Sequence, residues 1–249
     1  EYWIMKPTFA ETGTKYPLLL NMHGGPTAMW GPGEASMWHE HQFFCAQGYG
    51  VVYANPRGSG GYGVEFMKAN YRDWGTGPAD DVLRACSEAA KESWADTTKQ
   101  VITGGSYAGY LTAWIIAHDY RFKAAFAQRG VYDLTTFMGE GNAWRLVPGY
   151  FGGYPWEDET KASMDANSPY TFVDKIKTPF LIKHGENDLR TGVIQSEMMY
   201  KSLKILGREV EYVRMPGGTH ELSRTGNPRQ RIDRMLRIYE FFERYVGKK

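Results

Sequence analysis

Residues 103–110 read Thr-Gly-Gly-Ser-Tyr-Ala-Gly-Tyr and lie between a short apolar run and a longer apolar segment. The first run is typical of a buried strand, the second of a helix. A serine on such a turn has the setting of a nucleophile elbow, where small residues two positions before and after it let the backbone bend sharply. Gly104 and Ala108 fill those positions, although the strict Gly-x-Ser-x-Gly string is not met. This setting predicts Ser106 as a nucleophile, the alternative being a glycine-rich turn with a helix-capping serine.

The same alternation of strands and helices extends along the chain. Short apolar runs predict strands at residues 2–5, 17–22, 50–54, 100–103, 123–128, 180–183 and 210–215. Longer segments predict helices at residues 38–47, 78–91, 107–118, 193–206 and 228–245. An aromatic-rich segment at residues 131–170 is expected to be irregular. The pattern predicts an α/β fold with a mostly parallel sheet and helices on both faces.

Composition limits the domain organisation and the partners. A chain of 249 residues with 42% hydrophobic residues can bury a sizeable core, so we expect one domain over residues 1–249. Lys+Arg number 29 against 28 for Asp+Glu, with no basic stripe, so nucleic acid is not expected as a partner. No apolar run is long enough to span a membrane. The sequence contains no Asn-x-Ser/Thr acceptor, from which we expect a cytoplasmic location; nothing in it indicates the oligomeric state.

No metal or cofactor is expected. Cys45 and Cys86 fall within predicted helices and lack Cys-x-x-Cys spacing, which disfavours a disulfide framework or a zinc site. His39 and His41 flank Glu40, but residues two apart on a helix point in different directions. We expect these three side chains at the surface.

We expect the general base downstream of Ser106, because in this fold the three catalytic residues occur along the chain in the order nucleophile, acid, histidine. Of six histidines, His184 and His220 lie well downstream. His184 ends a predicted strand with no well-placed acidic loop between it and the serine. His220 lies in the loop between the last strand and the last helix, which predicts it as the general base.

The orienting acid is expected in the loop at residues 184–188, after the preceding strand. Its task is to accept a hydrogen bond from the second histidine nitrogen and to stabilise the imidazolium. Asp188 is nearer the tip of the loop, and Glu186 is the rival candidate.

Two glycine-rich loops, at residues 23–26 and 58–63, are interpreted differently. Residues 23–26, His-Gly-Gly-Pro, follow an inner strand and can direct backbone N–H groups into the site as part of an oxyanion hole, the alternative being a plain turn. Residues 58–63 match Gly-x-Gly-x-x-Gly, but a dinucleotide site needs a helix to open there and an acid about 20 residues on. Neither is expected, so we interpret residues 58–63 as a loop. The aromatic residues between 137 and 156 either line a specificity pocket or pack the edge of the core.

Taken together, these motifs resemble the catalytic domain of the prolyl oligopeptidase family of serine peptidases, most closely its acylaminoacyl-peptidase branch. The resemblance implies Ser106 as nucleophile, His220 as base and Asp188 rather than Glu186 as acid. It implies the backbone N–H groups of Gly25 and Tyr107 as the oxyanion hole. The motifs that carry it are Tyr16-Pro17, His23-Gly24-Gly25-Pro26, Asn55-Pro56-Arg57-Gly58-Ser59-Gly60-Gly61-Tyr62-Gly63, Gly104-Gly105-Ser106-Tyr107, Lys177-Thr178-Pro179, His184-Gly185-Glu186-Asn187-Asp188, Gly207-Arg208 and His220-Glu221-Leu222-Ser223.

The resemblance implies cleavage of acylaminoacyl or short oligopeptide bonds through an acyl-enzyme. The N-terminal β-propeller of the family has no counterpart in these residues, so we expect either a separated catalytic domain or a stand-alone carboxylesterase acting on short acyl esters. In both cases we expect the chain to hydrolyse short esters readily and peptides poorly, because an activated ester needs less protonation of its leaving group. A non-catalytic binding module on the same fold is the alternative from another functional class.

Overall fold

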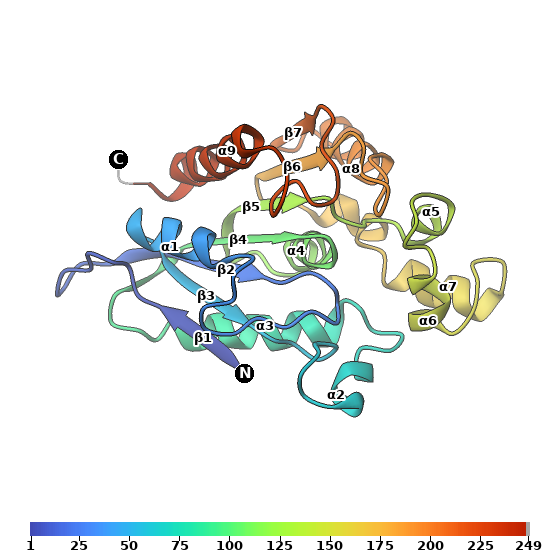
Figure 1. Ribbon diagram of the computed structural model, residues 1–249, viewed down its shortest axis with the longest axis horizontal. Helices are drawn as coiled ribbons and strands as arrows, with labels where there is room; N and C mark the ends of the chain where they lie inside the picture. The colour runs from blue at the N-terminus through green and yellow to red at the C-terminus, as the bar shows by residue number, and fades with distance from the viewer. Residues whose placement is uncertain (248–249) are drawn as a thin grey trace.

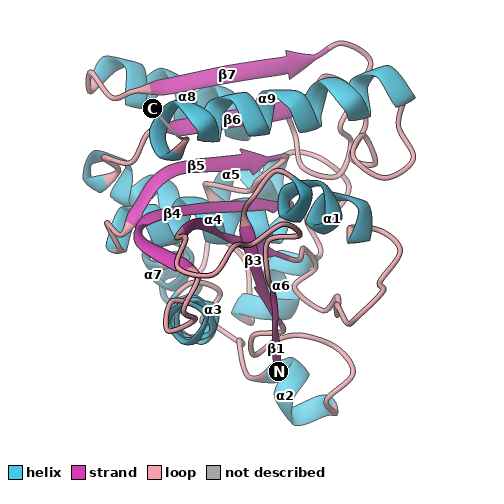
Figure 2. Cartoon of the chain, turned by 90° about the vertical axis from the view of Figure 1, so that its left-hand side faces the viewer, coloured by secondary structure: helices cyan, strands magenta, loops and turns pink. Residues whose placement is uncertain are grey.

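Seven strands form one sheet in the computed structural model, which describes residues 1–247. The strands lie in the order β1-β3-β2-β4-β5-β6-β7 (Figure 2). β1 pairs antiparallel with β3, and every other strand pairing in the sheet is parallel. The predicted mostly parallel sheet is confirmed, although the last two residues of the expected domain, 248 and 249, lie outside the described residues. The strands are β1 (Tyr2–Met5), β2 (Tyr16–Met22), β3 (Gly50–Ala54), β4 (Ala95–Gly105), β5 (Phe122–Gln128), β6 (Phe180–Gly185) and β7 (Val210–Met215).

Helices cover both faces of the sheet, because successive strand side chains point to opposite faces. On β2, Leu18 and Leu20 belong to the larger core cluster and Leu19 to the smaller one. The larger cluster is closed by helices of one layer and the smaller cluster by helices of the other (Figure 1). The first layer holds α3 (Thr76–Ala89), α4 (Tyr107–His118) and α8 (Ile194–Ile205), and the second holds α1 (Trp38–Ala46) and α9 (Pro228–Val246).

The segment expected to be irregular is largely helical, which corrects the prediction for residues 131–170. The Asp133 carboxylate accepts a hydrogen bond from the Thr136 N–H at 2.6 Å and so caps the first of these short helices. Phe137 and Phe151 are buried in the larger cluster, and Phe151 packs against Trp74. Those two aromatic side chains therefore pack the core edge. The helices are α5 (Leu134–Gly139), α6 (Leu146–Phe151), α7 (Asp158–Ala166) and the 3-10 helix η1 (Pro169–Lys175).

The other main differences from the prediction are the start of one helix, the length of one strand and one additional short helix. The helix expected from residue 78 begins at Thr76, because Asp73 accepts hydrogen bonds from the Thr76 and Gly77 N–H groups at 2.9 Å. The strand expected at residues 100–103 extends over Ala95–Gly105. A short helix, α2 (Val64–Lys68), opens directly after the glycine-rich loop that was expected to lack one.

His39, Glu40 and His41 of α1 were expected at the surface, and this expectation is wrong for Glu40 and His41. Glu40 and His41 are buried, whereas His39 is exposed, as expected. The Glu40 carboxylate pairs with the buried Arg234 guanidinium of α9. The His41 ring stacks on Tyr53 with a centroid distance of 4.6 Å. Helix α1 therefore packs with its charged residue inward, because α9 supplies the opposite charge.

Candidate active site

Ser106 occupies the turn between β4 and α4 with backbone angles φ 61° and ψ −124°. A positive φ is strained for a residue other than glycine, so surrounding contacts must hold it. The Ser106 N–H donates to the Gln128 carbonyl and its own carbonyl accepts from the Tyr110 N–H, each at 3.0 Å. A Cβ added to Gly104 would lie 2.6 Å from the Cβ of Ala108. The elbow therefore requires glycine at position 104 and accommodates alanine at position 108.

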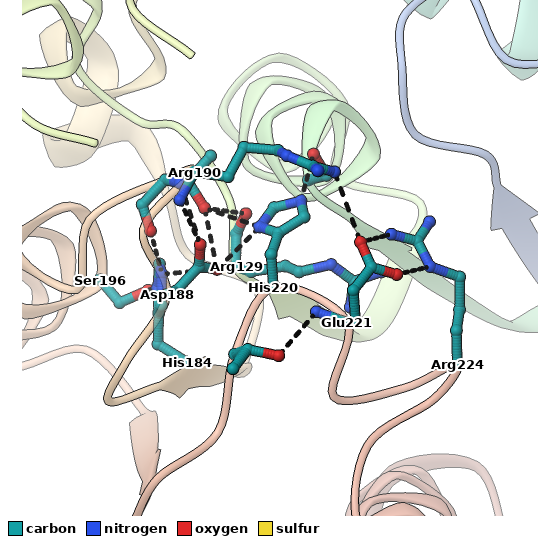
Figure 3. A network of polar contacts seen from close by, with 11 residues as sticks. Arg129, His184, Asp188, Arg190, Ser196, His220, Glu221 and Arg224 are labelled. Atoms are coloured by element: carbon teal, nitrogen blue, oxygen red, sulfur yellow. Dashed lines mark hydrogen bonds and ion pairs between the residues drawn. The ribbon is translucent and has the colours of Figure 1, made fainter. Parts of the chain in front are cut away.

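Asp188 and His220 lie in the loops that follow β6 and β7, at the same edge of the sheet as Ser106. Figure 3 shows the Asp188 and His220 side chains close together. The Nε2 atom of His220 lies 3.1 Å from Ser106 Oγ, and its Nδ1 atom lies 2.7 Å from Asp188 Oδ2. The rival acid Glu186 instead accepts from the Gly217 N–H at 3.3 Å and lies 3.3 Å from Arg214. The structure thus brings Ser106, His220 and Asp188 together and leaves Glu186 outside.

The two loops that carry His220 and Asp188 pack directly against each other. A Cβ on Gly185, at the end of β6, would lie 2.4 Å from the Gly218 carbonyl oxygen. The Asn187 N–H donates to that same carbonyl at 2.8 Å. The sequence therefore places glycine where the acid loop and the histidine loop approach each other most closely.

Burial and hydrogen bonding set the charges of the pair in opposite directions. Burial disfavours the imidazolium and lowers the pKa of His220 to about 4, although the hydrogen bond to Asp188 acts the other way. Burial alone would raise the pKa of Asp188, but contacts with His184 and His220 and the Thr191 N–H hold it well below its usual range. Neutral imidazole beside an ionised carboxylate is the protonation state that a general base needs.

The loop at residues 23–26 lies against the nucleophile. A Cβ on Gly24 would be 3.3 Å from the Cβ of Ser106. Gly25 has φ +128°, and a Cβ there would lie 2.5 Å from the Thr27 and Ala28 nitrogens. Both Gly25 and Ser106 line a cavity of about 260 Å³. Tyr107 is the first residue of α4, where backbone N–H groups lack an intrahelical acceptor.

The second glycine-rich loop supports the first. Ser59 Oγ lies 2.9 Å from Nε2 of the buried His23, and the Gly60 N–H donates to the Thr27 carbonyl at 3.2 Å. A Cβ on Gly60 would lie 2.8 Å from that carbonyl oxygen. Residues 58–63 therefore hold the loop that carries Gly25.

Three residues that contact Asp188 were not identified from the sequence as parts of the site: His184, Arg190 and Thr191. His184 is fully buried, with Nδ1 2.7 Å from Ser196 Oγ and Nε2 3.5 Å from Asp188 Oδ2. The Thr191 N–H and the Arg190 N–H donate to Asp188 Oδ1 at 3.0 and 2.9 Å. The position of His184 at the end of β6, directly before the acid loop, was the available signal.

Neither a metal-binding cluster nor a membrane-spanning helix occurs within residues 1–247. No group of three or more His, Cys, Asp or Glu side chains there is arranged to hold a metal ion. Within the same residues, no helix combines the length and the apolar character needed to cross a membrane.

Comparison with known proteins places this geometry in context. Residues 35–249 match the model of the prolyl oligopeptidase family. The chain is 41% identical over 245 residues to the uncharacterized peptidase YuxL of Bacillus subtilis, covering 98% of this chain and 37% of that protein. It is 30% identical over 221 residues to dipeptidyl-peptidase 5 of Porphyromonas endodontalis, covering 88% and 32%. The structure superposes on the acylaminoacyl peptidase of Pyrococcus horikoshii with a TM-score of 0.92 and 32% identity, covering 100% of this chain and 40% of that one.

Each comparison covers a much larger share of this chain than of the protein it is compared with. Nearly all of this chain is matched, yet it spans about 37% of the length of the Bacillus relative. The matched part includes Ser106, Asp188 and His220, and the fold that holds them.

Proposed function

Because the chain belongs to the prolyl oligopeptidase family, we propose that it is a serine hydrolase that cleaves peptide bonds through an acyl-enzyme. The observation that carries this proposal is the pair of contacts at His220: 3.1 Å to Ser106 Oγ and 2.7 Å to Asp188 Oδ2. A serine hydroxyl becomes a nucleophile when a neutral imidazole accepts its proton and a carboxylate orients that imidazole.

The proposed reaction has two halves. Ser106 Oγ attacks the carbonyl carbon while its proton moves to Nε2 of His220, and the N–H groups of Gly25 and Tyr107 stabilise the oxyanion. The tetrahedral intermediate expels the leaving group as His220 returns the proton to it. Water then repeats the same sequence on the ester, which releases the acid and restores Ser106.

The substrate class is proposed from the relatives. Their names describe a peptidase, a dipeptidyl-peptidase and an acylaminoacyl peptidase, so we place short or N-terminally blocked peptides first. Location in the cytoplasm, organisation of residues 1–249 as one domain and the absence of a cofactor remain predictions from the sequence.

The test combines active-site labelling with turnover. A fluorophosphonate probe should label the folded chain at Ser106, and Ser106→Ala should remain unlabelled. The values of kcat/KM for p-nitrophenyl acetate, acetyl-Ala p-nitroanilide and Ala-Ala p-nitroanilide then separate ester from amide cleavage. An unlabelled wild type, with acetate turnover no faster than that of Ser106→Ala, would instead favour the non-catalytic module.

A further inference from the structure

Arg129 is a buried cation next to the nucleophile that the proposed reaction does not use. It follows the last residue of β5, is 5% exposed and has φ 46°, a strained value for a residue other than glycine. Its N–H donates to the Lys183 carbonyl at 2.8 Å, and its carbonyl accepts from Thr191 Oγ1 at 3.1 Å. The backbone on both sides of the strained residue is therefore fixed.

The guanidinium of Arg129 has no partner among residues 1–247. Its Nε and Nη1 atoms are buried without a hydrogen bond, and no carboxylate of these residues lies within 4.0 Å. Burial, followed by the charges of Arg224 and Arg234, lowers its pKa to about 9, so the group stays charged at pH 7. An unpaired buried charge is costly, and this one is held in place by backbone contacts.

The same guanidinium borders the cavity that contains Ser106. Both residues line it, and a Cβ added to Gly105 would lie 3.2 Å from Arg129 Cζ. The cation therefore lies against the backbone immediately before the nucleophile. In Figure 3, Arg129 belongs to the same cluster as His220, Asp188 and Glu221.

The other charged groups that face this cavity have partners within the described part of the chain. Arg224 and Arg190 both pair with Glu221, at 2.6 and 3.4 Å. Arg234 pairs with Glu40, and Glu34 accepts hydrogen bonds from the Ser36 N–H and hydroxyl. Of the four arginines that line the cavity, Arg129 is thus the one without a carboxylate partner in residues 1–247.

We propose that Arg129 binds a carboxylate of the substrate, so that this site prefers substrates with a carboxylate close to the scissile bond. A guanidinium presents N–H groups in forked pairs that match the two oxygens of a carboxylate. A carbonyl oxygen would accept a hydrogen bond but leave the buried charge uncompensated. The carboxylate belongs either to the free C-terminus of the leaving segment or to an acidic group on the acyl segment. The inference rests on the proposed hydrolase function.

Two matched substrate pairs distinguish these sources. For the leaving side, we compare acetyl-Ala-Ala with its C-terminal amide; for the acyl side, succinyl-Ala p-nitroanilide with acetyl-Ala p-nitroanilide. In the wild type, the acidic member of one pair should have a kcat/KM roughly 10- to 100-fold higher, as expected for a charge-assisted hydrogen bond. In Arg129→Gln this ratio should fall to about one, and Arg129→Lys should retain part of it.

The matched control is Arg237→Gln, which changes an exposed arginine of α9 that does not line the cavity, and it should keep the wild-type ratio. A ratio near one in both pairs for the wild type, or a ratio unchanged in Arg129→Gln, overturns the inference. Labelling of Ser106 by the fluorophosphonate separates this result from failure of the proposed function. If Arg129→Gln does not fold, the inference is tested on the wild type by inhibition of p-nitrophenyl acetate turnover. Acetyl-alanine should then inhibit at least about tenfold more strongly than its amide. Equal inhibition by the two compounds overturns the inference.

Discussion

Oδ2 of Asp188 lies 2.7 Å from Nδ1 of His220, although a second carboxylate, Glu186, stands two residues earlier in the same loop. The loop turns so that Asp188 Oδ1 accepts the Arg190 and Thr191 N–H groups, which fixes its carboxylate toward the histidine. Glu186 faces Arg214 and solvent on the other side. The two acidic residues of this loop therefore lie in different environments: Asp188 beside His220, and Glu186 beside Arg214.

Removing the charge at Asp188 should nearly abolish turnover. We expect Asp188→Asn to lower kcat by about 10⁴-fold, because an amide neither stabilises the imidazolium nor holds the required tautomer. Glu186→Gln is the matched control and should stay within about threefold of wild type, since its ion pair is exposed. Steady-state kinetics with p-nitrophenyl acetate measure both. The opposite ranking would reassign the acid.

Much of this arrangement could be predicted from the sequence, because periodicity and loop chemistry are local. The bounds of β7 (Val210–Met215) and α4 (Tyr107–His118) agree with the prediction, and the loops after β2, β4, β6 and β7 converge because parallel strands end at one edge. The choice between Asp188 and Glu186 could not be made from spacing. It depends on the direction of the turn at the end of β6, which the packing of Gly185 against Gly218 determines.

The features that the sequence could not predict depend on contacts between distant parts of the chain. Glu40 pairs with a residue 194 positions away, so its burial cannot be recognised from α1 alone. The short helices at residues 134–166 lack a long apolar period. Their aromatic residues become recognisable as core only when Trp74 packs against Phe151.

The pH dependence should reflect the lowered pKa of His220. Burial favours the neutral imidazole, which is the form that accepts the Ser106 proton, so activity is lost only as pH falls through the pKa of about 4. We expect kcat/KM for p-nitrophenyl acetate to be nearly constant from pH 7 down to about pH 5. Circular dichroism at each pH checks that the protein remains folded. A midpoint near 6.5, the ordinary histidine value, would contradict the expectation.

The two small positions of the elbow should respond differently to substitution. In Gly104→Ala the new Cβ would lie 2.5 Å from the Ala108 carbonyl oxygen, so we expect a loss of about 1–3 kcal/mol in the free energy of unfolding and reduced activity. Ala108→Gly removes a buried methyl group in the first turn of α4 and should cost about 1 kcal/mol with activity retained. Urea denaturation and ester turnover of the two variants provide the comparison. Equal effects would mean that the elbow does not depend on this contact.

Gly25 should be required for the oxyanion hole. A Cβ at this position would lie 2.5 Å from two backbone nitrogens, so Gly25→Ala must shift the loop that carries the donor N–H. Loss of one such donor typically lowers kcat by about 10²–10³-fold. Gly33→Ala is the matched control, because Gly33 also has a positive φ but meets nothing within 4 Å. We expect the control to keep its kcat, and a similar loss in both variants would point to backbone strain alone.

The buried ion pair beneath the site should matter more for stability than an exposed pair. Arg234 and Glu40 are each about 1% exposed at the side chain, and Arg234 also donates to Gln128 Oε1 at 2.8 Å. Glu40→Met leaves the guanidinium buried without its carboxylate and should reduce the free energy of unfolding by about 3–5 kcal/mol. The double variant Glu40→Met/Arg234→Met removes both charges and should recover a large part of that loss.

The comparison needs an exposed reference pair and an equilibrium measurement. Lys91→Gln removes one partner of the exposed pair with Glu88 and should change stability by less than about 1 kcal/mol. Urea denaturation of the four proteins, followed by circular dichroism, gives the three differences from wild type. If Glu40→Met costs no more than Lys91→Gln, the buried pair contributes nothing measurable. If the double variant is as unstable as Glu40→Met alone, the loss arises from packing rather than from an unpaired charge.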